Sequence, residues 1–316
     1  MLPEEKLRVG LFLSGVLAVY GAAAGFLLHA AWDRWVRREP GRLRPALRRL
    51  RAAVLALAGL GVACGLYARL VEPTWLEVTH SEVGSARLPP GARVRVVHIT
   101  DVHSDPDARL EPRLPEVIAA ERPDVIVYTG DSLNAIEGLP HFRALMTELA
   151  AIAPTYAVRG NWDTSLWRGV DLFGGTGAVE LDGRAVRAPV DGVELWIAGV
   201  PADGADRLEQ VLAAVPRAAA SILLHHYPDE ADRVAELEVD LYAAGHTHGG
   251  QVALPLYGAL VTLARTGKRF EAGLYRVKRT AVYVGRGVGM EGGDAPRVRF
   301  FARPEVAVID LVGMRP

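Results

Sequence analysis

The sequence is poor in cysteine and in net charge, and both shortages exclude whole classes of protein. A single cysteine, Cys64, stands among 316 residues, which rules out a disulfide scaffold and a cysteine-rich zinc or iron–sulfur site. The formal net charge is −1, so the basic excess of a nucleic-acid-binding protein is missing. Half of the residues are hydrophobic, which excludes a disordered or collagen-like chain.

Long apolar runs, by contrast, are present near the start of the chain. Residues 9–32 contain no Asp, Glu, Lys or Arg, and residues 52–71 contain only Arg69. A helix of about 20 apolar residues crosses the hydrocarbon core of a bilayer, so we expect two membrane spans. The alternatives are two buried core helices, or a cleaved signal peptide for the first run, and both runs are long for those segments.

The loop between the two runs, residues 33–51, is strongly basic. It holds eight arginines against Asp33 and Glu39. The positive-inside rule places such a loop in the cytoplasm, and two spans then put the rest of the chain outside the cytoplasm. We therefore divide the chain into a membrane anchor, residues 1–75, and a main body, residues 76–316, and expect the lipid bilayer as a partner.

The main body alternates strand-like and helix-like segments, and Gly/Asp turns at 181–183 and 189–192 suggest hairpins. Near-continuous apolar strands separated by helices indicate parallel strands buried on both faces. The pattern predicts an α/β fold. Strands are expected at 94–100, 124–129, 155–158, 193–200, 220–224, 239–243, 281–284 and 306–311, and helices at 110–120, 141–152, 205–214 and 229–235.

Five of these strands end in clusters of Asp, Asn and His. The carboxyl ends of strands line the ligand crevice of open α/β sheets, so the clusters should meet. Oxygen and nitrogen ligands without thiolate suit Mn²⁺, Zn²⁺ or Fe, and seven ligands are too many for one tetrahedral zinc ion. Two ions sharing one carboxylate would use them all. The clusters read DVH at 101–103, GD at 130–131, GNWD at 160–163, HHYP at 225–228 and GHTHGGQ at 245–251.

Each cluster alone has an ordinary explanation. Gly-Asp and Gly-Asn are common turn sequences, and a His pair before Pro is usually a surface loop. The combination is far more specific, because five of the nine histidines fall in these clusters. His-x-His is the strongest single element, since alternate residues of an extended chain face the same way.

The five clusters, in this order, resemble the calcineurin-like metallophosphoesterase superfamily. GHTHGGQ and the glycine-rich stretch at 285–311 are similar to its membrane-associated bacterial branch. The resemblance covers residues 93–312 and implies a two-sheet αββα sandwich, here preceded by two transmembrane helices, with a dinuclear metal centre. It also implies that a hydroxide bridging two divalent ions attacks phosphorus in line, without a covalent enzyme intermediate.

Carried over residue by residue, the resemblance assigns seven ligands. One ion takes Asp101, His103 and His248, and the other takes Asn161, His226 and His246. Asp131 bridges the two ions. Asn161 would also stabilise the transition state, and the residues that complete the last motif, Gly249, Gly250 and Gln251, are candidates for substrate contacts.

The sequence departs from the family at Trp162. The usual motif is Gly-Asn-His-Asp/Glu, whose His is thought to protonate the leaving oxygen, and an indole cannot do so at neutral pH. Asp163 or His225 would then have to supply the proton. Alternatively, the substrate has a weakly basic leaving group such as phosphate, which needs little protonation.

These observations favour a membrane-anchored hydrolase of phosphoester or pyrophosphate bonds. A lipid-linked substrate such as UDP-diacylglucosamine fits both Trp162 and the anchor, although that substrate is handled on the cytoplasmic face and the basic loop predicts the opposite side. The alternatives are a general phosphodiesterase or phosphatase acting on soluble substrates, and a membrane regulatory protein that contains metal but catalyses nothing. No nucleic-acid partner is expected.

Overall fold

The computed structural model describes residues 1–38, 43–292 and 296–314. It separates the chain into two compact units, Met1–Val71 and Glu72–Pro316. The division falls a few residues before the boundary that the sequence suggests near residue 75. Part of the basic loop, residues 39–42, lies outside the described residues, as does part of the glycine-rich stretch, residues 293–295.

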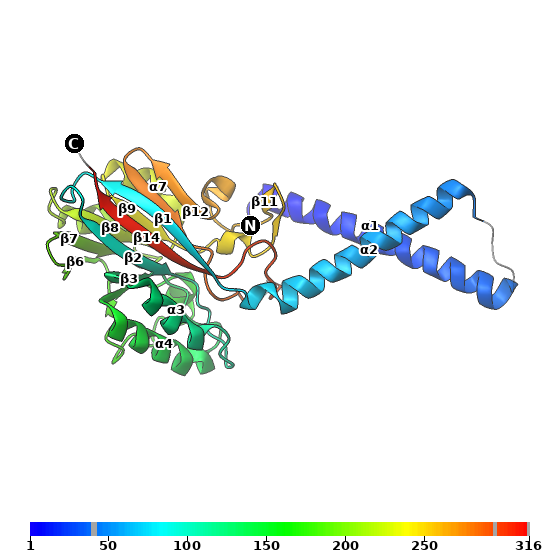
Figure 1. The fold of residues 1–316 in the computed structure, drawn as a ribbon, viewed down its shortest axis with the longest axis horizontal. Helices are drawn as coiled ribbons and strands as arrows, with labels where there is room; N and C mark the ends of the chain where they lie inside the picture. Colours follow the sequence, from blue (N-terminus) through cyan, green and yellow to red (C-terminus); the bar gives the residue numbers. More distant parts are fainter. Residues whose placement is uncertain (39–42, 293–295, 315–316) are drawn as a thin grey trace. The chain divides into compact units, whose positions relative to one another are not determined.

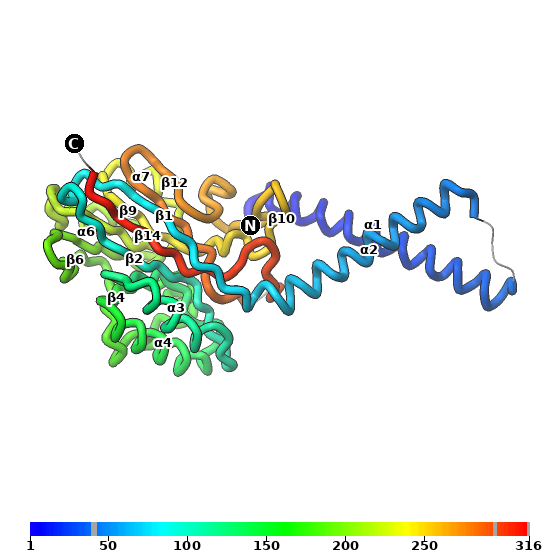
Figure 2. The backbone as a smooth tube through the Cα atoms, viewed as in Figure 1, coloured from blue at the N-terminus to red at the C-terminus, as the bar shows by residue number. Residues whose placement is uncertain are grey.

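The first unit is a pair of long helices, α1 (Pro3–Trp32) and α2 (Pro45–Leu70) (Figure 1). The helices cross one another (Figure 2), and the Tyr20 hydroxyl donates a hydrogen bond to the Ala58 carbonyl over 3.2 Å. Their most apolar windows have mean hydropathies of 2.0 and 1.9, and only 6% and 11% of these windows is buried. Both helices are therefore long and apolar enough to cross a membrane.

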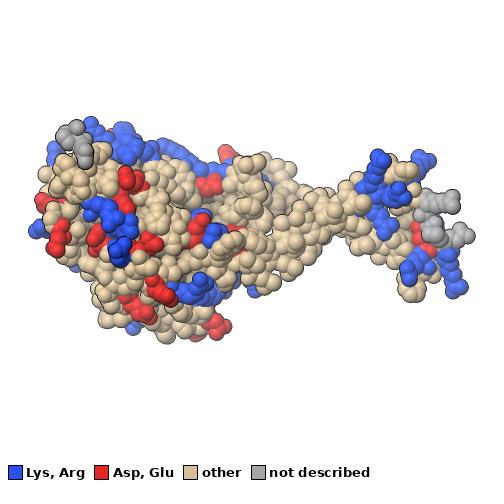
Figure 3. Space-filling view, in the orientation of Figure 1, with Lys and Arg blue, Asp and Glu red and all other residues tan. Residues whose placement is uncertain are grey.

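Most arginines of this unit gather at the end where the helices are joined. Figure 3 shows blue Lys and Arg side chains around that end and almost none along the crossed helices. A short π-helical segment, Asp33–Arg37, continues α1 into this region. The distribution agrees with an apolar middle flanked by a basic loop, which is the pattern of a helical hairpin in a bilayer.

The second unit contains two six-stranded sheets and one small two-stranded sheet. The first sheet has, in order across it, β1 (Glu77–Ser85), β14 (Glu305–Gly313), β2 (Arg93–Ile99), β3 (Val125–Tyr128), β4 (Thr155–Ala157) and β5 (Val179–Glu180). The second has β12 (Gly273–Val277), β13 (Thr280–Val284), β9 (Leu241–Ala244), β8 (Ala220–Leu224), β7 (Leu195–Gly199) and β6 (Arg184–Ala188). The small sheet pairs β10 (Ala253–Leu254) with β11 (Gly258–Ala259).

Helices cover the outer faces of the two large sheets. A core of Val, Ile and Leu side chains from both sheets lies between them. A second core joins the first sheet to α3 (Leu114–Glu121) and α4 (Leu139–Ile152), and a third joins the second sheet to α6 (Leu208–Ala213) and α7 (Ala231–Glu236). The predicted αββα sandwich is confirmed, because strands buried on both faces need a layer on each side.

Strand direction brings the polar clusters to one edge. Strands β2, β3 and β4 run parallel in the first sheet, and β7, β8 and β9 run parallel in the second. The turn at 189–192 does join β6 and β7 as a hairpin. The hairpin expected at 181–183 is wrong, because that turn carries the chain from β5 in one sheet to β6 in the other.

Candidate metal centre

The loops that carry the clusters have an unusual backbone. Five of the seven candidate ligands have positive φ angles, a conformation that costs a side-chain-bearing residue about 1–3 kcal/mol. Asp and His tolerate it better than most residues. Such a concentration at one place is typical of a functional site, where the surrounding fold imposes the backbone. The five are Asp101 (50°), His103 (44°), Asp131 (59°), His246 (71°) and His248 (51°).

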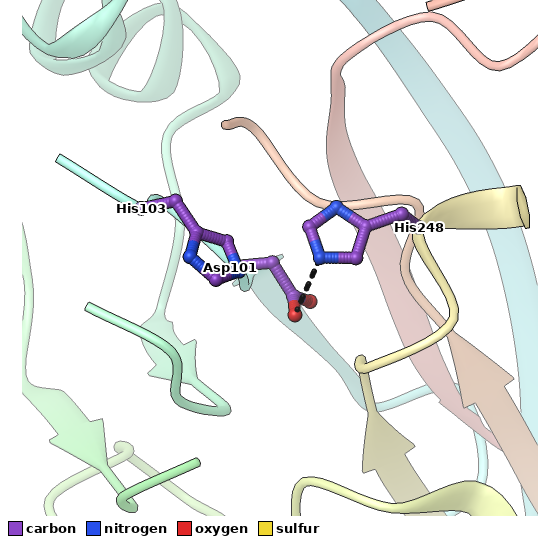
Figure 4. A group of neighbouring side chains, drawn as sticks. All are labelled: Asp101, His103 and His248. Atoms are coloured by element: carbon purple, nitrogen blue, oxygen red, sulfur yellow. Dashed lines mark ion pairs between the residues drawn. The ribbon is translucent and has the colours of Figure 1, made fainter. Parts of the chain in front are cut away.

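Two groups of three buried side chains place ligand atoms within 4.8 Å of one another. The first group is Asp101, His103 and His248 (Figure 4), in which His248 Nε2 lies 3.3 Å from Asp101 Oδ1. The second group is Asp101, Asp131 and His226. Asp101 belongs to both groups, so the two candidate positions are adjacent.

Asp131 lies between histidines that the sequence assigns to different ions. Its Oδ2 atom is 3.6 Å from His103 Nε2 and 3.3 Å from His226 Nε2. Its other oxygen accepts a hydrogen bond from the Trp162 backbone N–H over 2.8 Å. The carboxylate is thereby oriented with one oxygen held by the chain and one oxygen directed at both histidines, which suits a bridging ligand.

The remaining two candidates lie beside these groups. The ring centroid of His246 is 5.3 Å from that of His226. Asn161 begins the short helix α5 (Asn161–Ser165), directly after Gly160. The Asn161 Oδ1 atom is buried and has no hydrogen-bond partner within the described part of the chain. All seven side chains are thus brought to one region.

Several other polar atoms of the cluster also lack partners. Among the described residues, both ring nitrogens of His103, the Nε2 of His226 and the Nδ1 of His248 are buried without a hydrogen bond. Buried polar atoms are normally paired, so an unpaired set of lone-pair donors fits a metal site. His226 illustrates the arrangement, because its Nδ1 donates to the Thr129 carbonyl over 2.7 Å and leaves Nε2 for a ligand bond.

The electrostatics of the cluster favour a bound cation. Burial lowers the pKa of His103 and of His246 to about 4, so both rings are neutral near pH 7 and have a free lone pair. Burial would raise the pKa of Asp131, but the charges of His226 and His103 and the hydrogen bonds from His226 and from the Trp162 N–H together lower it to about 2. Burial likewise opposes protonation of His226, yet the attraction of Asp131 raises its pKa to about 9. The surroundings of Asp131 and His226 therefore stabilise positive charge, which a bound cation would supply.

Glycines let the ligand loops approach one another closely. Gly130 has φ of 99°, and a Cβ atom there would lie 2.2 Å from the Gly160 nitrogen. A Cβ atom on Gly160 would lie 2.1 Å from Asp131 Oδ1. The glycines of the Gly-Asp and Gly-Asn clusters are thus required by packing, and they set Asp131 and Asn161 side by side.

Asp163 ties the same two loops together. Its carboxylate is fully buried and accepts hydrogen bonds from the backbone N–H groups of Asp131, Ser132 and Gly160, each at 2.9 Å. The Ser132 hydroxyl donates a fourth over 3.2 Å. Burial and the charge of Asp131 raise the pKa of this carboxyl to about 6, against the effect of the backbone donors, so the group is largely ionised near pH 7. Because all four partners are donors, these contacts favour a positioning role.

The second candidate for a proton donor, His225, lies away from the ligand groups. It is fully buried, stacks on the Tyr242 ring at 6.5 Å between centroids, and directs Nδ1 at the Val200 carbonyl. Tyr242 and Val200 belong to the core beneath α6 and α7. His225 therefore faces the outer layer, as alternation along a strand predicts, and its position does not favour contact with a leaving group.

The three candidates for substrate contact, Gly249, Gly250 and Gln251, all make close contacts within the protein. The Gln251 side chain donates to the Pro296 carbonyl over 2.7 Å and accepts from the Glu291 N–H over 2.9 Å. A Cβ atom on Gly250 would lie 2.4 Å from that of Ala259. Gly249 has φ of 60° and packs on Arg286. Their geometry favours holding the glycine-rich stretch against the ligand loops.

Trp162 lies beside His103 and Asp131, at the position of the family His. It is half-buried, and its ring meets that of His103 edge to face with 5.2 Å between centroids. Its side chain lies close enough to Glu291 to influence that carboxyl, whose pKa is raised by burial and by the charge of Asp131. Sequence reasoning missed Glu291, and its only signal was its place in the glycine-rich stretch.

Fold and site together define a phosphoester hydrolase of the two-metal type. The family model described as calcineurin-like phosphoesterase matches residues 94–250, the stretch that carries all seven candidate ligands. The chain belongs to this family, whose members depend on dinuclear metal centres, and it is a metal-dependent phosphoesterase. The identity of its ions is a separate matter, because the donor set accommodates more than one metal.

Three curated relatives extend the similarity. The chain is 32% identical over 258 residues to the uncharacterized metallophosphoesterase YkuE of Bacillus subtilis, covering 78% of this chain and 88% of that protein. It is 28% identical over 286 residues to phosphodiesterase YaeI of Escherichia coli, covering 85% and 98%. It is 23% identical over 322 residues to UDP-2,3-diacylglucosamine pyrophosphatase LpxG of Chlamydia muridarum, covering 81% and 95%.

Proposed function

We propose that the protein is a membrane-anchored hydrolase of phosphodiester or pyrophosphate bonds in lipid-linked substrates. The observation that carries this proposal is the buried cluster of unpaired ligand atoms around Asp101 and Asp131. Asp101, His103 and His248 would hold one divalent ion, and Asn161, His226 and His246 the other, with Asp131 shared.

The ions would polarise the phosphate oxygens and lower the pKa of water to give a hydroxide nucleophile at neutral pH. The chain's own residues position the ligands and stabilise the charge of the transferring group. Asp163 holds the loops of Asp131 and Asn161 in register, and the Thr129 carbonyl orients His226. The Asn161 amide would also stabilise charge on the transferring phosphoryl group.

Trp162 bears on the class of substrate. General-acid catalysis accelerates a reaction by about 10²–10⁴-fold, chiefly where the leaving group is strongly basic. The indole of Trp162 cannot donate a proton at neutral pH. A phosphate leaving group has a second pKa near 6 when it is a monoester and departs without that help. The names of two relatives, a phosphodiesterase and a diacylglucosamine pyrophosphatase, agree with diester or anhydride cleavage.

A substrate panel tests this proposal on the full chain in detergent. Turnover of an activated aryl diester, an alkyl phosphomonoester and UDP-diacylglucosamine would be compared after loading with Mn²⁺, Zn²⁺ or Fe²⁺. We expect turnover of the diester and the lipid pyrophosphate and little of the alkyl monoester. Preference for soluble monoesters would support the general phosphatase instead. Retention of metal without turnover of any substrate would support a non-catalytic regulatory protein.

The side of the membrane is a second part of the proposal. The basic loop supports a catalytic unit outside the cytoplasm, which suits an exported phospholipid better than UDP-diacylglucosamine. A reporter fused after residue 316 tests the orientation. Activity of a periplasmic reporter supports the proposed side, and activity of a cytoplasmic reporter alone overturns it and restores the nucleotide-linked lipid as the better substrate.

A further inference from the structure

The catalytic unit exposes large apolar side chains on three segments that are distant in sequence. Leu256 at the tip of the β10–β11 hairpin is completely exposed, and Tyr257 beside it is 48% exposed. Phe301 is 59% exposed and Trp75 is 50% exposed. Isolated exposed apolar residues are ordinary, whereas a contiguous set marks an interaction surface. We call these four residues the apolar rim.

Contacts show that the three segments adjoin one another. Val252, just before β10, forms a parallel bridge with Phe300, and the Ala253 N–H donates to the Phe300 carbonyl over 2.8 Å. Two residues after Phe301, the Arg303 guanidinium lies 4.3 Å from the centre of the Trp75 ring. The segments that carry the rim therefore lie next to one another in the catalytic unit.

The rim also borders the metal cluster. Strand β1 begins at Glu77, just after Trp75, and runs parallel to β14, which is antiparallel to β2. The start of β1 therefore lies at the edge where β2 ends and Asp101 follows. The hairpin begins just after His248, and Figure 2 shows the hairpin and the start of β1 at the same end of the unit.

The short linker between α2 and Trp75 suggests that the partner of the rim is the membrane. Helix α2 ends at Leu70, and the five residues to Trp75 can span at most about 18 Å. Trp and Tyr are the side chains enriched at the level of lipid head groups. Each aromatic of this type in the rim is paired with a cation, because Lys268 Nζ lies 3.9 Å from the centre of the Tyr257 ring and Arg303 covers Trp75. Such pairs place an apolar ring beside a polar group, as in the aromatic belts of membrane proteins. Each cation is also ion-paired within the chain, Lys268 with Glu271 at 3.3 Å and Arg303 with Glu77 at 3.3 Å, so the apolar side chains rather than net charge carry the docking.

We propose that the apolar rim is a membrane-docking surface, which inserts Leu256 and its neighbours among the lipid head groups and so holds the metal cluster against the bilayer surface. This inference rests on the membrane anchoring proposed above. It adds that the catalytic unit contacts lipid directly, rather than being tethered at a distance. The substrate class that follows is a phosphate group carried by a membrane lipid.

Fluorescence quenching tests the rim on the full chain in lipid nanodiscs. Replacing Cys64 by Ser removes the sole cysteine, and Leu256→Cys then carries one bimane label. The matched control is Asp191→Cys, in the exposed turn between β6 and β7 at the opposite edge of the sheets. Lipids with a nitroxide near the head group should quench the label at 256 and leave that at 191 bright, because an interfacial segment sinks about 5–10 Å.

Two further measurements separate the outcomes. Equal quenching at 256 and 191 in protein that still co-floats with vesicles would overturn the rim while leaving the anchor intact. Failure to co-float would overturn the anchoring proposal itself. As a second variant, Leu256→Asp should abolish the quenching of a label at Tyr257→Cys while turnover of a soluble aryl diester stays unchanged. Protection of the label at 256 in lipid-free micelles, with dimeric protein, would instead indicate a second copy as the partner.

Discussion

Replacing Asp163 by Asn tests whether this carboxylate positions the ligand loops. The substitution keeps the shape of the side chain and removes its charge. Oδ2 accepts from Asp131 N–H, Gly160 N–H and the Ser132 hydroxyl, and Oδ1 accepts from Ser132 N–H. The Asn oxygen can take the place of Oδ2, but its NH₂ group then faces the Ser132 N–H.

The expected loss follows from those bonds. One charge-assisted hydrogen bond is broken and the others are weakened, each bond to a charged group being worth about 1.5–3 kcal/mol. We expect unfolding to become easier by about 2–4 kcal/mol, since a buried donor is also left unpaired. For a unit of this size the melting temperature should fall by roughly 5–10 °C. Metal affinity should fall by about 10–100-fold, as for other residues that orient ligands.

Thermal melting of the full chain in detergent and its metal content measure both effects. Asp203→Asn is the matched control, because Asp203 pairs with Arg168 at 2.7 Å on the surface, with side chains 42% and 71% exposed. Such a pair is worth at most about 1 kcal/mol. If Asp163→Asn melts with the parent, keeps its ions, and slows only substrates with basic leaving groups, Asp163 is a proton donor and our reasoning is wrong.

Four further outcomes are expected. Asp131→Asn should abolish diester turnover and should melt close to the chelator-treated parent, because the amide oxygen can still accept from the Trp162 N–H while the shared metal ligand is lost. Gly160→Ala should lower melting temperature and metal content together, since its Cβ would lie 2.1 Å from Asp131 Oδ1, whereas Gly169→Ala, where a Cβ meets no described atom within 4 Å, should change neither. Trp162→His should raise alkyl monoester turnover by up to about 10²-fold and leave an activated diester unaffected. Removing the ions with a chelator should lower the melting temperature reversibly, measured before and after adding Mn²⁺.

The meeting of the candidate ligands at one place could be predicted from the sequence because its signal is local. Asp101, Asp131 and His226 each directly follow an apolar strand, and parallel strands deliver such residues to a common edge. The buried strands predicted an α/β fold, and the two-sheet αββα arrangement was implied by the family resemblance. Strand β1 was missed because its sequence EVTHSEVGS mixes polar and apolar residues, and only pairing along β14 makes it a strand.

Roles that depend on contacts between distant segments could not be predicted. The motif makes Asp163 a candidate proton donor, and the four hydrogen bonds that its carboxylate accepts become evident only when the 131 and 160 loops meet. The motif makes Gln251 a candidate for substrate contact, and the structure adds that its side chain holds residues 291 and 296. Residue type in a motif indicates which chemistry is available, whereas packing decides whether that chemistry faces the substrate or the protein.

Trp162 affects both the geometry of the site and the class of substrate that it can cleave. Its backbone N–H holds one oxygen of Asp131 and its ring packs on His103, so the residue contributes to the ligand geometry while offering no proton. A site with Trp at this position would still hold its metal ligands in place, and it would lack only the proton donation that basic leaving groups require. Because phosphate departs without that assistance, the same substitution that would disable an alkyl phosphatase leaves a pyrophosphatase intact. The substrate preference of the parent and the gain in monoester turnover of Trp162→His therefore test the same claim, that the missing acid at position 162 limits cleavage of basic leaving groups.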